Sequence, residues 1–268
     1  MGLSPGLDFE SKLFFKPEAA RLLERELSRK GYRPAPIHIG GNTDPYQPIE
    51  RRLRVTRGLI EVLDRFEHPF SIITKSAMIV RDLDLLAPMA RRNLVRTAVS
   101  VTTLDRKLAR AMEPRAATPE RRLDAVRRLS QAGVACAVSV APIIPGLNDH
   151  EIEAILERAA EAGASGAHFT VLRLPLEIKD LFREWLQAER PGRAARVMSL
   201  VRQMRGGQDY DSRWNSRMSG QGPVAELIAA RFRTAKRRLE LDRERSPLDV
   251  GKFQIPPKPG DQMDLFPA

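Results

Sequence analysis

Cysteine is almost absent from this sequence: Cys136 is the only one among 268 residues. A disulfide framework needs pairs of cysteines and is therefore excluded. The same count excludes a structural zinc or iron–sulfur site built from several cysteines of this sequence. Cys136 lies in an apolar, strand-like stretch, where a cysteine is more typical of a small core residue than of a reactive thiolate.

Long apolar runs are lacking too. No stretch approaches the ~20 apolar residues of a membrane helix, and no signal-peptide pattern opens the sequence. We therefore expect a soluble, cytoplasmic protein with no membrane partner. The phosphate-binding patterns GxxxxGK[ST] and GxGxxG are missing, as is any Ser–His–Asp or Cys–His nucleophile set. The four histidines have no metal-ligand spacing, which predicts structural roles for them.

Acidic residues are fewer than basic ones, 34 against 45, which gives a formal net charge of +11. The excess is concentrated. Residues 91–128 hold eleven Lys or Arg against four Asp or Glu, and residues 231–245 hold seven against three. Such a surface favours a polyanionic partner, of which nucleic acid is the first to expect. A basic bias shared by a whole proteome is the alternative explanation.

Short apolar, β-branched runs recur roughly 30 to 40 residues apart, the repeat of a strand–helix unit. They lie at 37–39, 71–74, 98–102, 137–140 and 168–172. Helical periodicity fills the gaps at 49–66, 121–131 and 151–162, where Asn148 and Glu151 are typical of a capping box. Five such units predict an α/β fold with a parallel sheet or barrel.

The two ends of the sequence depart from this rhythm. A helix at 17–30 precedes the first strand, whereas a parallel unit begins with a strand. We therefore expect that an N-terminal strand is missing or that the domain begins irregularly. After residue 174, helices are predicted at 178–188, 194–204 and 223–241. The expected domains are a barrel at 1–182, a C-terminal helical extension at 183–245, and a Pro-rich linker and tail at 246–268.

Ligand sites of parallel α/β folds lie at the carboxyl ends of the strands. The residues that follow the predicted strands are Gly40, Gly41, Asn42, Thr43 and Asp44, then Lys75, then Ser100 and Thr102, then Pro142 and Ile143. The polar glycine-containing run favours a ligand-binding loop over a simple turn. For Lys75 a pocket cation and a solvated surface residue are equally good interpretations, and for Ser100 and Thr102 pocket hydroxyls and ordinary strand residues are.

Five segments resemble one known family: GGNTDPYQPIE at 40–50, SIITKS at 71–76, VSVTTLD at 99–105, APIIPGLND at 141–149 and LRLPLEIKDLF at 172–182. They are similar to radical S-adenosylmethionine (SAM) proteins of the branch related to spore photoproduct lyase, usually called DNA repair photolyase-like. The resemblance implies a partial TIM-type (β/α)6 barrel. It also implies a lyase-like radical enzyme that uses a [4Fe–4S] cluster and SAM, with nucleic-acid repair or modification as its task.

By the same resemblance, Gly40, Gly41, Asn42, Thr43 and Asp44 match the loop that holds the SAM amino group. Lys75, Ser100 and Thr102 match contacts to its ribose or carboxylate, and Pro142 and Ile143 match the wall beside the adenine. Family members carry CxxxCxxC shortly before the segment that corresponds to residues 2–9. This sequence lacks those cysteines, so we expect a chain that lacks the first strand and cluster loop and is inactive as written.

Three further hypotheses remain. Lys75 is the candidate Schiff-base residue of an ordinary barrel lyase or aldolase. Alternatively, the chain is a non-catalytic DNA-binding or sliding-clamp-associated protein. The tail Gln262–Phe266 is similar to the Gln-x-x-Leu-Phe peptide with which bacterial repair proteins bind the DNA sliding clamp. Gln262, Leu265 and Phe266 would then contact the clamp; the alternative is a tail that folds back on the barrel.

Overall fold

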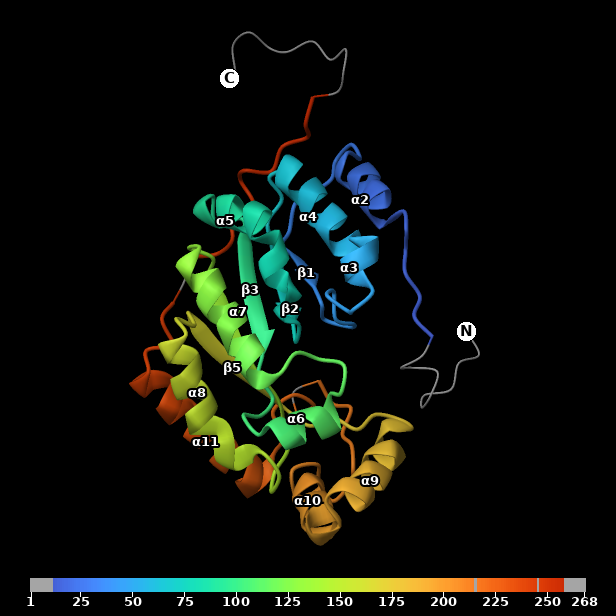
Figure 1. Cartoon of the computed structure of the whole chain (residues 1–268), viewed down its shortest axis with the longest axis vertical. Coiled ribbons are helices and arrows are strands. Elements are labelled where there is room, and N and C mark those ends of the chain that lie inside the picture. Colours follow the sequence, from blue (N-terminus) through green and yellow to red (C-terminus); the bar gives the residue numbers. More distant parts are fainter. Residues whose placement is uncertain (1–11, 215, 245, 258–268) are drawn as a thin grey trace.

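The computed structural model describes residues 12–214, 216–244 and 246–257. A five-stranded parallel sheet forms its centre, in the order β1-β2-β3-β4-β5 (Figure 1). The strands are β1 (Ile37–Ile39), β2 (Phe70–Thr74), β3 (Val95–Ser100), β4 (Cys136–Ile143) and β5 (Gly166–Val171). The sheet curves but does not close. The predicted α/β fold of the partial TIM-type barrel class is thus confirmed.

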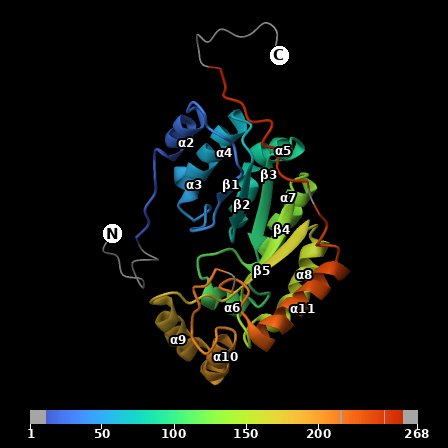
Figure 2. The ribbon, with the colours of Figure 1, turned by 180° about the vertical axis from the view of Figure 1, so that it is seen from behind.

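Helices alternate with these strands and cover the outer face of the sheet (Figures 1 and 2). Those before β4 are α2 (Ala19–Leu27), α3 (Glu50–Leu53), α4 (Val55–Arg65), the 3-10 helix η1 (Ala77–Asp82), α5 (Leu83–Arg91), α6 (Arg106–Met112) and α7 (Pro119–Gln131). Those after β4 are η2 (Asp149–Glu151), α8 (Ile152–Glu161), α9 (Ile178–Glu189), α10 (Pro191–Gln203) and α11 (Gly222–Arg238). In the described part of the chain, no helix has both the length and the apolar character needed to cross a bilayer.

Side chains alternate between the two faces of the sheet, as the pleat requires. Phe70, Ile72 and Thr74 of β2 are buried under the helices, while Ser71 and Ile73 point to the concave face and are half-buried. Cys136 is paired in register with Thr97 of β3 and is fully buried. The core therefore lies between the sheet and the helices that cover it.

A close approach of backbone to backbone fixes the loop that leaves β1. Gly40 adopts a φ of +96°, and a Cβ atom there would stand 2.2 Å from the carbonyl oxygen of Ile73 in the neighbouring strand. Only glycine combines that backbone conformation with that contact. The first glycine of the Gly40–Gly41 pair is thus required by strand packing, whatever else the loop does.

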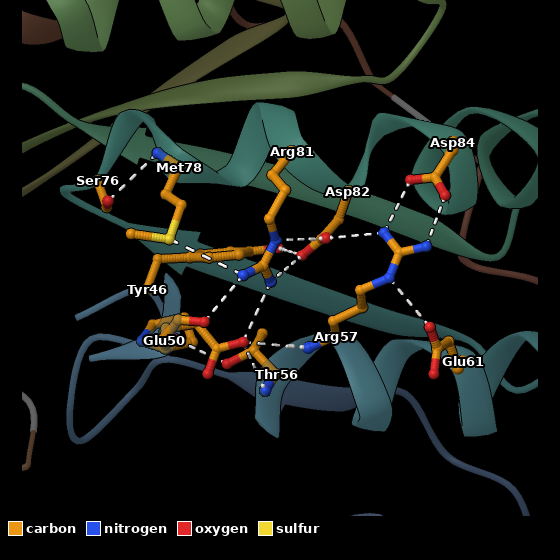
Figure 3. Close-up of polar contacts among 11 residues, drawn as sticks. Tyr46, Glu50, Thr56, Arg57, Glu61, Ser76, Met78, Arg81, Asp82 and Asp84 are labelled. Atoms are coloured by element: carbon orange, nitrogen blue, oxygen red, sulfur yellow. Dashed lines mark hydrogen bonds and ion pairs between the residues drawn. The ribbon is translucent and has the colours of Figure 1, made fainter. Parts of the chain in front are cut away.

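A cluster of buried charges anchors the next part of this loop (Figure 3). Asp82 of η1 is fully buried and accepts hydrogen bonds from the Tyr46 hydroxyl at 2.9 Å, from Arg57 at 3.1 Å and from Arg81 at 2.8 Å. Arg81 also pairs with Glu50 at 3.1 Å. Burial beside Asp82 raises the pKa of the Tyr46 phenol, which therefore stays a hydrogen-bond donor.

The helix predicted over 49–66 is divided at Arg54, whose φ of 51° is left-handed. The division has a physical reason. The Glu50 carboxylate accepts hydrogen bonds from the backbone N–H groups of Thr56 at 3.1 Å and Arg57 at 3.4 Å. It therefore satisfies donors in the first turn of α4. The same carboxylate is then held by Arg81.

Asn148 does not form the predicted capping box. Its side chain makes no cap hydrogen bond, because it is buried and used elsewhere. Its Oδ1 accepts from the backbone N–H of Ile144 at 2.6 Å, and its Nδ2 donates to the carbonyl oxygens of Thr102 at 2.8 Å and Pro142 at 3.1 Å. Asn148 thus joins the carboxyl ends of β3 and β4.

Beyond the carboxyl ends of the strands lie α6, α9 and α10 (Figure 1). The α11 helix instead packs along α8, where Arg231 forms a two-bond ion pair with Glu153 at 2.6 and 2.8 Å. Its apolar residues Ile228 and Phe232 join the core cluster of β4, β5 and α8. The α9 helix spans the expected domain limit at residue 182, and the limits themselves stay predictions.

Residues 246–254, the start of the expected linker, run back along the amino ends of the strands. Asn93 donates to the carbonyl oxygen of Pro247 at 2.8 Å, and the Gln254 N–H donates to that of Phe66 at 3.1 Å. The centroid of the Phe253 ring lies 5.4 Å from that of the Tyr32 ring and 5.6 Å from that of the His68 ring. This segment is part of the domain; the tail residues Gln262, Leu265 and Phe266 lie outside the described residues.

Replacing the two loop glycines one at a time tests the packing argument. Gly40→Ala is expected to lower the free energy of unfolding by about 2 kcal/mol or more, since it adds a left-handed alanine and a clash with backbone. Gly41→Ala is the matched control. Its Cβ would meet only the movable His38 ring, at 3.1 Å, and we expect less than about 1 kcal/mol. Equal losses in urea denaturation would contradict this explanation.

Candidate functional site

The residues predicted after β1 and β2 meet at the carboxyl edge of the sheet. Oδ1 of Asp44 accepts hydrogen bonds from the Thr74 hydroxyl at 2.6 Å and the Tyr46 N–H at 2.8 Å, and Oδ2 accepts from the Lys75 N–H at 2.7 Å. Both carboxylate oxygens are thus engaged within the protein. Asp44 ties the loop to β2, and the exposed Gly41, Asn42 and Thr43 form the open rim.

Glu113 joins the ends of β2 and β3. Its carboxylate accepts from Lys75 Nζ at 2.7 Å, from Arg122 at 2.6 Å and from the Thr102 hydroxyl at 3.1 Å. Arg122 is 2% exposed. Its guanidinium group also donates hydrogen bonds to the carbonyl oxygens of Ser100 at 3.2 Å and Ala117 at 2.7 Å. The Glu113 carboxylate, whose side chain is only 11% exposed, therefore orients the Lys75 ammonium at the rim, where the Lys75 side chain is 37% exposed.

Burial alone would raise the pKa of the Glu113 carboxyl, but Lys75 and Arg122 outweigh it and hold that pKa below its usual value. Glu113 is therefore ionised at neutral pH. Its carboxylate holds Lys75 Nζ in an ion pair at 2.7 Å, whereas a Schiff-base nucleophile needs an amine that is free to attack.

The remaining predicted residues line the ends of β3 and β4. Ser100 and Thr102 are buried, and the Thr102 hydroxyl also donates to the carbonyl oxygen of Ala141 at 3.2 Å. Pro142 follows a cis peptide bond and is half-buried. Ile143 is fully buried in the core under α8. The ten predicted positions thus occupy four adjacent strand ends, but Gly41, Asn42, Thr43, Lys75 and Pro142 offer the more accessible surface.

The model of the Radical SAM superfamily matches residues 12–159, more than half of the chain. The chain belongs to the radical SAM superfamily. The match covers all four strand ends just described, from the β1 loop to the β4 loop. Membership implies SAM as a ligand and a [4Fe–4S] cluster as its usual companion.

Curated relatives extend this assignment. An uncharacterized protein of Mycobacterium tuberculosis is 35% identical over 204 residues, which are 75% of this chain and 60% of that protein. An uncharacterized protein of Methanocaldococcus jannaschii is 30% identical over 115 residues, 43% of each chain. This radical SAM chain therefore spans about 60% of the length of the mycobacterial relative.

Among solved structures, a mutant of spore photoproduct lyase has a similar fold. The TM-score is 0.52 at 15% identity, over 83% of this chain and 63% of the other. Such a likeness shows shared architecture.

The residues of this radical SAM chain fit the two ligands unequally. For SAM, the loop after Gly40 exposes the polar groups of Gly41, Asn42 and Thr43. They lie beside Lys75, whose ammonium group is held by Glu113. For the cluster, the one cysteine is buried in β4, and burial raises the pKa of the Cys136 thiol to about 11. In the described part of the chain, no three His, Cys, Asp or Glu side chains gather as a metal site. These residues do not fit the cluster.

Sequence reasoning missed the roles of Glu113 and Arg122, and it assigned Asn148 to a capping box instead of to the link between two strand ends. Glu113 counted only as one acid within a basic stretch, and its local sequence carries no sign that Lys75, 38 positions earlier, is its partner. The one available signal was that Glu113 is one of only four acids in a stretch with eleven Lys or Arg. Such residues connect strand ends through space, so spacing along the chain does not reveal them.

Removal of the Glu113 charge tests its role. Glu113→Gln leaves the buried Arg122 without its carboxylate and is expected to lower the free energy of unfolding at pH 7 by about 3 kcal/mol. Because the pKa of folded Glu113 is lowered, its contribution is complete above the unfolded pKa, near 4.5, and is lost as pH falls through the folded value. The gap between wild type and variant should narrow below about pH 4.5.

Denaturation curves at several pH values measure this gap. Glu120→Gln is the matched control, since Glu120 pairs with Arg106 at 2.7 Å at the surface, and it should cost under about 1 kcal/mol. A Glu113→Gln effect that is equally small at pH 7 would show that Glu113 does not organise the site.

Proposed function

We propose that this chain binds SAM at the carboxyl ends of β1 to β4 and takes part in radical chemistry on a nucleic acid, in repair or modification. The observation that carries the SAM assignment is the oriented Lys75 beside the open rim of the β1 loop, within the region that matches the family. In this site Asn42 and Thr43 supply hydrogen bonds, Lys75 holds the ribose or carboxylate, and Pro142 lies against the adenine.

The described residues carry the SAM-binding part of this proposal. They hold no group of three or more His, Cys, Asp or Glu side chains for the cluster that cleaves SAM in this family. The nucleic-acid assignment is supported by the net charge of +11 and by basic helices around the strand ends.

A non-catalytic nucleic-acid-binding protein is the second candidate, and the buried, lone Cys136 favours it. The two functions differ in one measurable property. The proposed SAM site requires stoichiometric SAM binding, whereas the second candidate requires only nucleic-acid binding that weakens steeply with salt.

Titration calorimetry of the chain with SAM tests the proposed site. We expect one site, and Lys75→Met should weaken binding about tenfold, since one charge-assisted hydrogen bond is removed. Lys179→Met, an equally conservative change at an exposed position on α9, should bind SAM like wild type. Absence of SAM binding in wild type, or equal losses in both variants, would refute the proposed site.

We also propose that the tail binds the bacterial sliding clamp. A peptide of residues 257–268 should bind the purified clamp, and the double change Leu265→Ala and Phe266→Ala should abolish binding, because the two apolar anchors are lost. Asp264→Ala in the same peptide serves as the control. Unchanged affinity of the double variant would remove the clamp from the list of partners.

A further inference from the structure

A cavity of about 710 Å³ opens beside the proposed SAM site. Its walls come from the β1 loop and α3, from the end of β2 with η1, and from the segment that leads into α7. It shares Asp44 and Lys75 with the SAM site. Its size lies within the roughly 300–1,000 Å³ of typical small-ligand sites.

The rim of this cavity is cationic. Arg51 of α3 and Arg121 and Arg128 of α7 line it and are exposed. Arg121 and Arg128 lie seven positions apart, so they share one helix face. Within the described part of the chain, the guanidinium groups of these three arginines have neither an ion-pair nor a hydrogen-bond partner, whereas the remaining arginines of α7, Arg122 and Arg127, are paired.

The acidic residues of the lining do not neutralise this rim. Asp44 is occupied by the Thr74 hydroxyl and two backbone N–H groups. Asp124 forms an ion pair with Arg127 at 2.9 Å. Unpartnered cations around a concave surface focus a positive potential into it, which favours an anion.

Part of the cavity lining is apolar. It consists of Ala77, Met78 and Val80 of η1 and of Ala116 and Ala117, and we call these five residues the floor; the polar Tyr46, Gln47 and Ser76 also line the cavity. A floor without hydrogen-bonding side chains suits a flat ring or a sugar, and a cationic rim suits phosphates. A ligand that carries both parts is a nucleotide.

We infer that this cavity binds a nucleotide unit of a single-stranded nucleic acid, with the base on the apolar floor and the flanking phosphates on Arg51, Arg121 and Arg128. The inference rests on the nucleic-acid part of the proposed function. It also places the strand next to the SAM site, because Lys75 and Asp44 belong to both. The bound strand would thereby lie along the carboxyl edge of the sheet, within reach of chemistry at that site.

Fluorescence anisotropy with a labelled strand of about 12 thymidines tests the rim. The triple variant Arg51→Gln, Arg121→Gln, Arg128→Gln should bind about tenfold more weakly or worse. Its plot of log affinity against log salt should be shallower by about 2, since each lost phosphate contact removes about 0.7 from the slope.

The matched control removes the same charge elsewhere. Arg25, Arg33 and Arg196 are exposed and lack side-chain partners within the described residues, and their triple change to glutamine should keep most of the affinity. If both triple variants lose affinity equally, binding depends on overall charge and the cavity is not the site.

A second variant tests the floor without altering charge. Ala116→Trp narrows the cavity and should weaken binding of the thymidine strand several-fold, while an abasic strand of the same length should bind wild type and variant alike. If the thymidine strand binds both proteins equally, no base enters the cavity and the inference is overturned.

SAM titration of the same variants separates this inference from the proposed function. Arginine variants that bind SAM normally but lose the strand support the cavity. Variants that bind both ligands like wild type overturn the cavity and leave the SAM site standing. A wild-type chain that binds SAM but not the thymidine strand overturns the inference together with the nucleic-acid part of the proposed function.

Discussion

The carboxylates of Asp82 and Glu50 are buried beside β1 and β2. The arrangement of the chain around these two strands follows from the need to neutralise both charges. A buried charge is strongly destabilising without a partner. Arg57 and Arg81 supply the partners, from α4 and η1 respectively. Because these arginines come from the connections after β1 and after β2, satisfying the acids locks the two connections together and fixes the loop that carries Tyr46.

Glu113, at the ends of β2 and β3, is also neutralised by basic residues from separate segments, but here the ion pairs have a different consequence. Its partners are the buried Arg122 and the partly exposed Lys75, so the ion pair reaches from the interior to the rim of the proposed site. A surface lysine loses much side-chain entropy when it is held in one conformation. Here the internal carboxylate holds it in advance, which lowers the entropy that a ligand has to overcome. The same principle that stabilises the fold therefore prepares the site.

The sequence allowed all five strands and most helices to be predicted, because short β-branched runs and 3.6-residue periodicity are local signals. The predicted site positions also lie on adjacent strand ends, as parallel topology requires. What failed depends on contacts between distant segments. Arg54 breaks a continuous periodic pattern since the Glu50 carboxylate caps the following helix. Asn148 does not cap a helix because its side-chain amide is hydrogen-bonded to three backbone groups at the ends of two strands.

The positive charge illustrates the same distinction between composition and placement. Residues 91–128 are rich in arginine, but Arg92, Arg106, Arg122 and Arg127 are used in ion pairs within the fold. A count of net charge treats these residues and Arg128 alike, although only an unpartnered guanidinium group is ready to bind a phosphate without first breaking an internal contact. Where such groups surround a cavity with an apolar floor, the ligand they select is defined by shape as well as by charge. Among the arginines that the fold leaves unpaired within the described residues, Arg51, Arg121 and Arg128 line one cavity, beside the strand ends that the family match covers. This shared placement, and not the net charge, is the basis for the inferred nucleotide site.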